Sequence, residues 1–129
     1  MRRMILAMVF FAGILSAHAQ EHTKLADTSD FVVASDGSGD FRTIQDAINA
    51  VPDYRKNRTT ILVKTGVYKE KLILPASKTN VRMVGEDPLK TILTYDDYAS
   101  KKNRFGEEIG TSGSASFYVF ADDFTAENL

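Results

Sequence analysis

The sequence contains no cysteine. This absence excludes disulfide bonds, a thiolate metal site, a cysteine nucleophile and a lipid attached through cysteine. A chain without disulfides must be stabilised by its core alone, which suits a well-packed β fold better than a small disulfide-stapled module. With 129 residues, 43% hydrophobic and 26% charged, the composition is that of one small globular domain.

Histidine is nearly as scarce, because His18 and His22 are the only two in the chain. Both precede the regularly patterned part of the sequence, which excludes a Ser-His-Asp triad and a multi-histidine metal site within these residues. Residues 36–40 (DGSGD) lack the third glycine of G-x-G-x-x-G and the ligand spacing of a calcium loop, so we interpret them as a tight turn. We therefore expect no metal and no organic cofactor.

A long apolar run occurs only near the N-terminus. Arg2 and Arg3 precede an apolar run over residues 4–15, and residues 17–19 (AHA) match a cleavage signal. This order predicts a secretory signal peptide over residues 1–19, and the run is too short to span a membrane. A short membrane anchor is the alternative, which the charged and small-residue flanks disfavour. We expect a secreted or periplasmic mature chain, away from the membrane, whose residues 20–30 are flexible.

An excess of positive charge is also missing. The 16 Lys+Arg stand against 17 Asp+Glu, which gives a net charge of −1. Removal of the signal peptide takes away Arg2 and Arg3, so that 14 Lys+Arg remain and the net charge becomes −3. A nucleic-acid partner would need a basic patch, and we therefore expect none.

Residues 32–51 predict a short strand, a glycine turn and an amphipathic helix. Thr43 is a suitable N-cap, and Pro52 cannot extend the helix beyond the preceding residue. Apolar residues recur on one face of this helix at the spacing of helical turns, namely Ile44, Ala47, Ile48 and Val51.

Short apolar runs bounded by turn residues follow the helix and predict strands. They lie at residues 61–63, 72–74, 81–84, 92–93 and 117–121. An antiparallel sandwich or barrel should show alternating polarity and Asn-Gly or Asp-Gly hairpin turns, and no such turn separates these runs. The runs are nearly continuous, and those at Ile61 and Val81 lie 20 residues apart. This favours a parallel β-helix whose N-terminal end is covered by the helix.

Residues 95–116 form a long, polar and charged segment, which we predict to be a functional loop. Its end, residues 110–116 (GTSGSAS), is small and hydroxyl-rich, so a polar ligand can approach the backbone there. Tyr68 and Glu70 share one face at strand spacing, and we interpret them as packing and turn residues.

Adjacent carboxylates occur three times, at residues 96–97, 107–108 and 122–123. Neighbouring side chains on a strand point to opposite faces, so none of these pairs is an acid/base dyad by itself. The residues alone therefore contain no complete catalytic constellation.

Six segments in order resemble the pectin methylesterases (pectinesterases). They are residues 33–41 (VASDGSGDF), 43–48 (TIQDAI), 61–70 (ILVKTGVYKE), 84–87 (VGED), 110–116 (GTSGSAS) and 124–129 (FTAENL). Each is weak singly, but taken in order they span nearly the whole chain after the signal peptide. The resemblance implies a mainly β, right-handed parallel β-helix over residues 31–129. It also implies hydrolysis of galacturonate methyl esters in pectin, without cofactor, by a full-length enzyme that we expect to be monomeric.

The resemblance implies a catalytic site elsewhere. The family's aspartate nucleophile, its acid/base aspartate and its oxyanion-binding glutamine belong to the motifs Q-A-V-A-L, Q-D-T-L and D-F-I-F-G, which would all follow Leu129. We therefore expect an N-terminal fragment that ends before its catalytic residues. Within it, Thr111 matches the family threonine that lines the sugar-binding cleft, and it is the one substrate-binding residue that we carry over.

Two other functions remain compatible with these residues. One is a different β-helix enzyme that acts on pectin, either a lyase or a polygalacturonase. The other is a non-catalytic exported β-helix that binds polysaccharide.

We predict that residues 20–129 alone have no esterase activity, because the catalytic motifs are not among them. Purified protein incubated with methylated pectin should release no more methanol than the blank. Methanol above the blank would show that a catalytic site lies within these residues.

Overall fold

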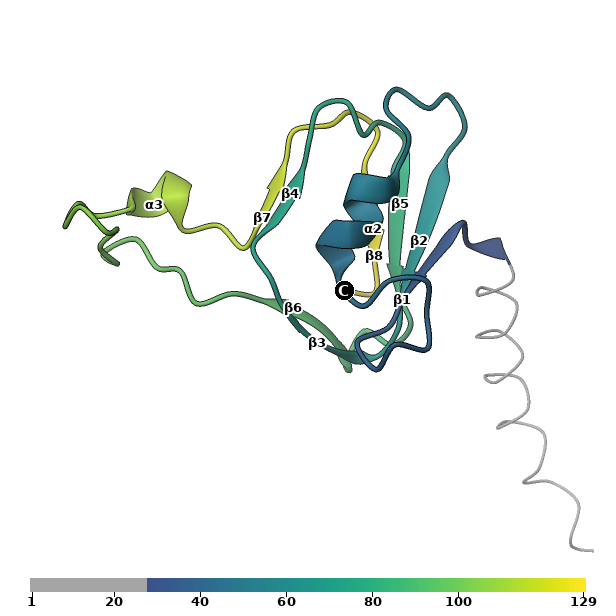
Figure 1. The fold of residues 1–129 in the computed structure, drawn as a ribbon, viewed down its shortest axis with the longest axis horizontal. Coiled ribbons are helices and arrows are strands. Elements are labelled where there is room, and N and C mark those ends of the chain that lie inside the picture. Colours follow the sequence, from purple (N-terminus) through teal and green to yellow (C-terminus); the bar gives the residue numbers. More distant parts are fainter. Residues whose placement is uncertain (1–27) are drawn as a thin grey trace, which may run out of the picture.

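Short parallel strands follow one another around the coils of the computed structural model, which describes residues 28–129 (Figure 1). The predicted signal peptide and residues 20–27 lie outside the described part. One coil contains β2 (Thr59–Val63), β3 (Gly66–Lys69) and β4 (Leu72–Leu74), and the next contains β5 (Val81–Gly85), β6 (Thr91–Thr94) and β7 (Phe117–Val119). β1 (Phe31–Val33) precedes them, and β8 (Thr125–Glu127) follows.

Each strand pairs with its counterpart in a neighbouring coil and not with another strand of its own coil. The largest sheet has the order β1-β2-β5-β8, while β3 pairs with β6 and β4 with β7, all in parallel. The predicted parallel β-helix is confirmed, and the antiparallel alternative is wrong. Ile61 lies opposite Met83, so the step between these coils is 22 residues.

The core lies inside the coils. Alternation along β2 directs Ile61 and Val63 inward, and Val81 and Met83 of β5 extend the same apolar cluster, all with 0% exposure. Each such side chain contributes about 1.5–3 kcal/mol by leaving water. Because the register stacks inward residue on inward residue, the core runs unbroken from coil to coil.

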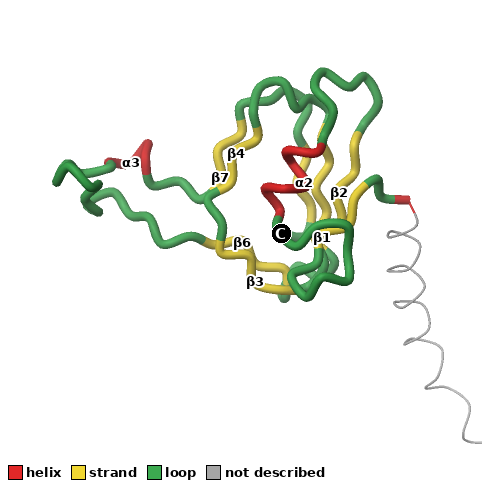
Figure 2. The backbone as a smooth tube through the Cα atoms, viewed as in Figure 1, coloured by secondary structure: helices red, strands yellow, loops and turns green. Residues whose placement is uncertain are grey.

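The predicted helix is α2 (Ile44–Ala50), and it covers the N-terminal opening of the coils (Figure 2). The Thr43 hydroxyl accepts a hydrogen bond from the Asp46 amide at 3.2 Å. Ile44, Ala47 and Ile48 are buried in the core cluster. The helix ends at Val51, whose extended backbone leads into Pro52.

Residues 36–40 form the tight turn that leads from β1 toward α2. The Asp40 carboxylate accepts from the Val32 amide at 2.8 Å, and that of Asp36 accepts from the Ser38 amide at 2.8 Å. At Gly39 a Cβ would lie 2.5 Å from the Val32 carbonyl oxygen. A larger residue would therefore force the turn away from β1.

The structure adds three elements to the sequence prediction. β3 and β8 are strands that no apolar run predicts, because β3 buries Tyr68 alone and no side chain of β8 is fully buried. The segment 95–116, predicted to be a loop, contains the one-turn helix α3 (Gly110–Gly113). β7 is shorter than the apolar run at 117–121 and ends at Val119.

Glu70 joins α2 to the first coil. Its two carboxylate oxygens accept from the amides of Ile44 at 2.9 Å and Gln45 at 3.1 Å. The Gln45 side chain in turn donates to the Ile73 carbonyl at 3.0 Å and accepts from the Ile73 amide at 2.9 Å. The first amides of a helix have no partner within it, so a carboxylate from a neighbouring strand satisfies them and favours the positive helix end.

We predict that Glu70→Ala lowers the free energy of unfolding by about 1–3 kcal/mol, because two helix amides lose a charged acceptor. Urea unfolding followed by circular dichroism measures the loss. Glu108→Ala is the matched control, since Glu108 is exposed and lies far along the chain from α2. Equal stability of the two variants would contradict the role of Glu70.

Candidate functional site

A polar arm leaves the coil between β6 and β7 and projects beyond the body of the molecule (Figure 1). The strands β4 and β7 pair Leu72 with Phe117, a step of 45 residues, against 22 between β2 and β5. The additional residues form the arm over residues 95–116. An insertion at this turn leaves both ladders intact, because the stacking of the coils depends only on the strands.

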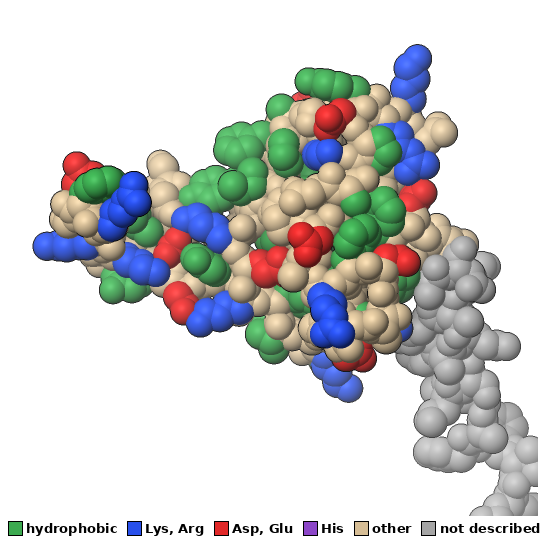
Figure 3. All heavy atoms as spheres, viewed as in Figure 1, with side chains coloured by type: hydrophobic (Ala, Val, Ile, Leu, Met, Phe, Trp, Pro, Cys, Tyr) green, Lys and Arg blue, Asp and Glu red, His purple; other side chains and the backbone are tan. Residues whose placement is uncertain are grey.

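Backbone hydrogen bonds hold the two limbs of the arm together. Lys102 and Glu108 form an antiparallel bridge, and the Ile109 amide donates to the Lys101 carbonyl at 2.9 Å. At the tip, the Asn103 side-chain oxygen accepts from the Phe105 amide at 2.8 Å and the Glu107 amide at 3.1 Å. The arm is thus a structured hairpin, and Figure 3 shows Lys and Arg side chains gathered at its outer end.

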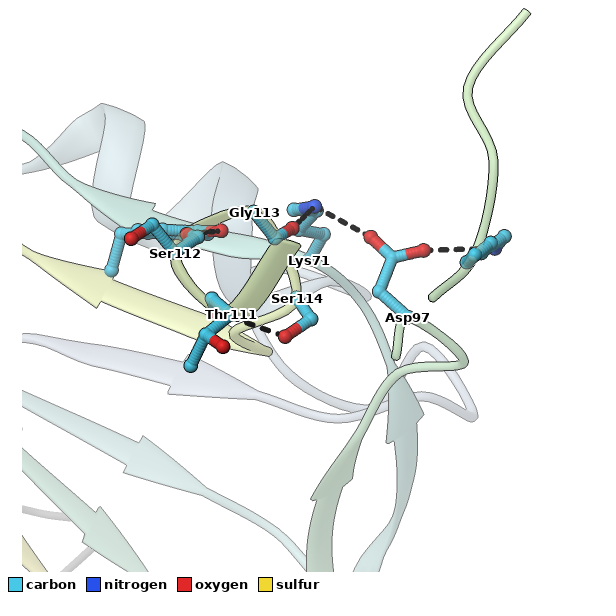
Figure 4. A network of polar contacts seen from close by, with 8 residues as sticks. Lys71, Asp97, Thr111, Ser112, Gly113 and Ser114 are labelled. Carbon is cyan, nitrogen blue, oxygen red and sulfur yellow. Dashed lines mark hydrogen bonds and ion pairs between the residues drawn. The ribbon is translucent and has the colours of Figure 1, made fainter. Parts of the chain in front are cut away.

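An ion-pair network lies where the arm joins the coil (Figure 4). Lys71, which precedes β4, contacts Asp97 at 2.5 Å and donates to the Gly113 carbonyl at 2.8 Å. The other oxygen of Asp97 contacts Lys101 at 2.8 Å. Asp97 therefore ties the outgoing limb of the arm to the coil, and Lys71 ties the returning limb.

This network carries a fixed charge at neutral pH. The hydrogen bond from Lys101, and then that from Lys71, lowers the pKa of the Asp97 carboxyl. The same carboxylate raises the pKa of both lysines. Two cations thus share one anion, which leaves one net positive charge at the base of the arm and favours anionic ligands.

Thr111 lies on the exposed surface of α3, beside this network (Figure 4). Its backbone carbonyl accepts from the Ser114 amide at 3.3 Å and the Ser114 hydroxyl at 3.0 Å, which closes the single helical turn. Within residues 28–129 no bond to the Thr111 hydroxyl is found. That hydroxyl is therefore free to donate to, and accept from, a ligand.

The other residues singled out from the sequence pack, cap a helix, form ion pairs or lie in a turn. The buried Tyr68 hydroxyl donates to the Lys64 carbonyl at 2.8 Å, and burial raises the pKa of Tyr68. Glu70 caps α2, as described above. Asp96 and Asp97 diverge, since Asp96 contacts Lys69 while Asp97 contacts Lys71. Asp122 and Asp123 are exposed in the turn after β7.

Sequence reasoning missed Lys71 and Tyr118 as residues of this site. The Tyr118 hydroxyl donates to the Ser112 carbonyl at 2.7 Å, and the Lys71 ammonium lies 5.7 Å from the Tyr118 ring centroid. The Tyr95 ring lies 5.9 Å from the same ammonium. No local pattern marks these residues, because the contacts of Lys71 with Tyr95 and Tyr118 join segments more than twenty residues apart.

Among residues 28–129, no group of three or more potential metal-binding His, Cys, Asp or Glu side chains lies together. No helix in the same part of the chain has the length and hydropathy needed to cross a membrane.

Comparison with known proteins decides the family. Residues 30–129 match the pectinesterase family. The chain belongs to this family. It is 48% identical over 100 residues to a pectinesterase/pectinesterase inhibitor of Ficus pumila var. awkeotsang, an alignment that covers 78% of this chain and 17% of that protein.

Solved pectin methylesterases share the fold. The enzyme from Erwinia chrysanthemi superposes with a TM-score of 0.67 at 33% identity, over 77% of this chain and 29% of that one. A pectin methylesterase in complex with a hexasaccharide gives the same values. The chain spans less than a third of the length of these enzymes.

We predict that Asp97→Asn weakens the attachment of the arm at neutral pH. The lowered pKa of Asp97 means that its contribution to stability is present above the unfolded value, about 3.9, and is lost as pH falls through the folded value. The melting temperature of the variant should therefore be below that of the wild type at pH 7, and the difference should narrow as the pH falls below about 4.

Asp122→Asn is the control, because Asp122 is exposed and forms no ion pair among residues 28–129. Melting followed at pH 7, 5 and 3 separates the two variants. A gap between Asp97→Asn and the wild type that is as large at pH 3 as at pH 7 would contradict the ion-pair explanation.

Proposed function

We propose that the protein to which these residues belong hydrolyses the methyl esters of galacturonate in pectin. The observation that carries the proposal is the match of residues 30–129 to the pectinesterase family, together with the likeness to a pectin methylesterase bound to a hexasaccharide. The net positive charge at the base of the arm agrees with an acidic polysaccharide.

The proposed chemistry is acyl transfer through an aspartate. A carboxylate oxygen attacks the ester carbonyl, and methanol leaves with a proton from the acid/base aspartate. Water then hydrolyses the resulting mixed anhydride between aspartate and galacturonate, and it returns a proton to the acid/base aspartate. The motifs that would supply these aspartates are not among residues 28–129. The share proposed for this chain is substrate binding, in that α3, at the base of the arm, contacts the polysaccharide beside the reacting ester.

Thr111 is the residue proposed to contact the sugar chain. Its hydroxyl is exposed on α3, next to a network that holds α3 against the coil. A hydroxyl on a fixed backbone can bond a sugar hydroxyl or a carboxylate with little loss of conformational entropy. We also propose that the protein is exported after cleavage of residues 1–19, which places it where pectin occurs.

We predict that Thr111→Val reduces the affinity for a methylated oligogalacturonide about 2- to 10-fold, because one hydrogen bond is lost while the shape is kept. Thr111→Ser should stay close to the wild type, since it retains the hydroxyl. Isothermal titration calorimetry with a methylated galacturonan hexasaccharide measures both variants.

Two results would count against the proposal. A wild-type chain that binds no galacturonan would contradict the pectin substrate itself. Equal affinity of the Val and Ser variants would contradict the contact from Thr111 and leave the substrate class in place.

A further inference from the structure

Two aromatic side chains lie on the outer surface immediately after α3. Along β7 the side chains alternate, so Phe117 packs against the core while Tyr118 lies on the opposite face. The Phe120 amide donates to the Leu74 carbonyl at 3.0 Å, which continues the ladder past the strand end and returns the Phe120 side chain to the face of Tyr118.

The arrangement of these two rings differs from that of the aromatic pairs in the core. Tyr118 and Phe120 are nearly parallel, with an interplanar angle of 14° and centroids 6.2 Å apart. The pairs Phe31–Phe41 and Phe117–Phe124 meet edge to face, at 89° and 74°. Edge-to-face contacts fill a core, whereas parallel rings on a surface offer ring faces to a ligand.

The outer ring of the pair is poorly covered. Phe120 is 63% exposed, although it is a large apolar side chain. Neighbouring coils stack along the edges of the strands, so they do not cover this outward face. A single exposed apolar side chain needs no explanation, but a stacked aromatic pair beside polar groups offers a ligand both an apolar face and hydrogen-bonding partners.

Tyr118 is held in place from two sides. Its hydroxyl donates to the Ser112 carbonyl at 2.7 Å, and the Lys71 ammonium lies 5.7 Å from its ring centroid. Lys71 is itself fixed by Asp97 and by the Gly113 carbonyl. The ring that flanks Phe120 is therefore ordered before any ligand arrives, which reduces the entropy lost on binding.

The surroundings indicate which ligand fits. The rings adjoin the exposed hydroxyl-bearing segment of Thr111 and Ser112, and the cluster of Lys71, Asp97 and Lys101 leaves one positive charge beside them. A galacturonosyl ring combines an apolar C–H face, hydroxyl groups and a carboxylate or its methyl ester. An aromatic face, hydroxyl groups and a nearby cation match each of these features.

We propose that Phe120, flanked by Tyr118, is a saccharide-binding platform on which a galacturonosyl ring of the pectin chain stacks, as a subsite next to Thr111. The proposal rests on the proposed function, because pectin supplies the ligand. It assigns a role to Phe120, which belongs neither to the core nor to the ion-pair network.

The test is binding of galacturonan hexasaccharides, methylated and unmethylated, to the chain and its variants by isothermal titration calorimetry. Phe120→Ala should lower the affinity about 3- to 10-fold, as expected for loss of one aromatic stacking contact. Phe120→Leu should lose affinity as well, because it keeps apolar volume without a ring. Phe120→Trp should stay within about twofold of the wild type.

Phe105→Ala is the matched control, since Phe105 is 72% exposed at the tip of the arm. It should bind like the wild type. Wild-type affinity in Phe120→Ala, or equal losses in Phe120→Ala and Phe105→Ala, would overturn the platform while leaving the proposed function intact. If the wild type binds neither hexasaccharide, both proposals fail. Circular dichroism of each variant verifies the fold, and retained binding by Phe120→Trp provides a readout that does not depend on a loss.

Discussion

The parallel, in-register stacking of β5 on β2 is the constraint on which the rest of the structure depends. Five residue pairs align from Thr59 opposite Val81 to Val63 opposite Gly85. A shift by one residue would turn Ile61 and Met83 away from the core, so burial and backbone hydrogen bonds select the same register. At Gly85 a Cβ would lie 1.9 Å from the Asn128 carbonyl oxygen, so the backbone of the next coil also approaches closely.

The same constraint explains why the arm is possible. The ladders restrict the strands, whereas the turns between them face solvent and add residues without disturbing the core. The segment 95–116 uses this freedom and forms its own hairpin, held by Asn103 at the tip and Asp97 at the base. A rigid coil thereby supports a polar extension whose orientation is set by ion pairs rather than by apolar burial.

The proposed saccharide surface combines segments that are distant in the sequence. Lys71 precedes β4, Asp97 and Lys101 lie on the outgoing limb, α3 lies on the returning limb, and Tyr118 belongs to β7. They meet because β4 and β7 pair in parallel, which brings Lys71 beside the end of the arm. The charge of the site and the order of its aromatic rings are therefore consequences of the coil stacking.

The sequence by itself determined the elements whose signals are local: the helix between Thr43 and Pro52, the glycine turn at residues 36–40, and the strands with continuous apolar runs. It also indicated the family, and it led to the proposal that Thr111 contacts the sugar chain. Tertiary structure alone decided the capping of α2 by Glu70, the strand β3, and the cluster of Lys71, Asp97 and Tyr118. Local patterns report propensity and periodicity, but a contact between separate segments depends on the register between coils, which is determined by the packing of the whole core.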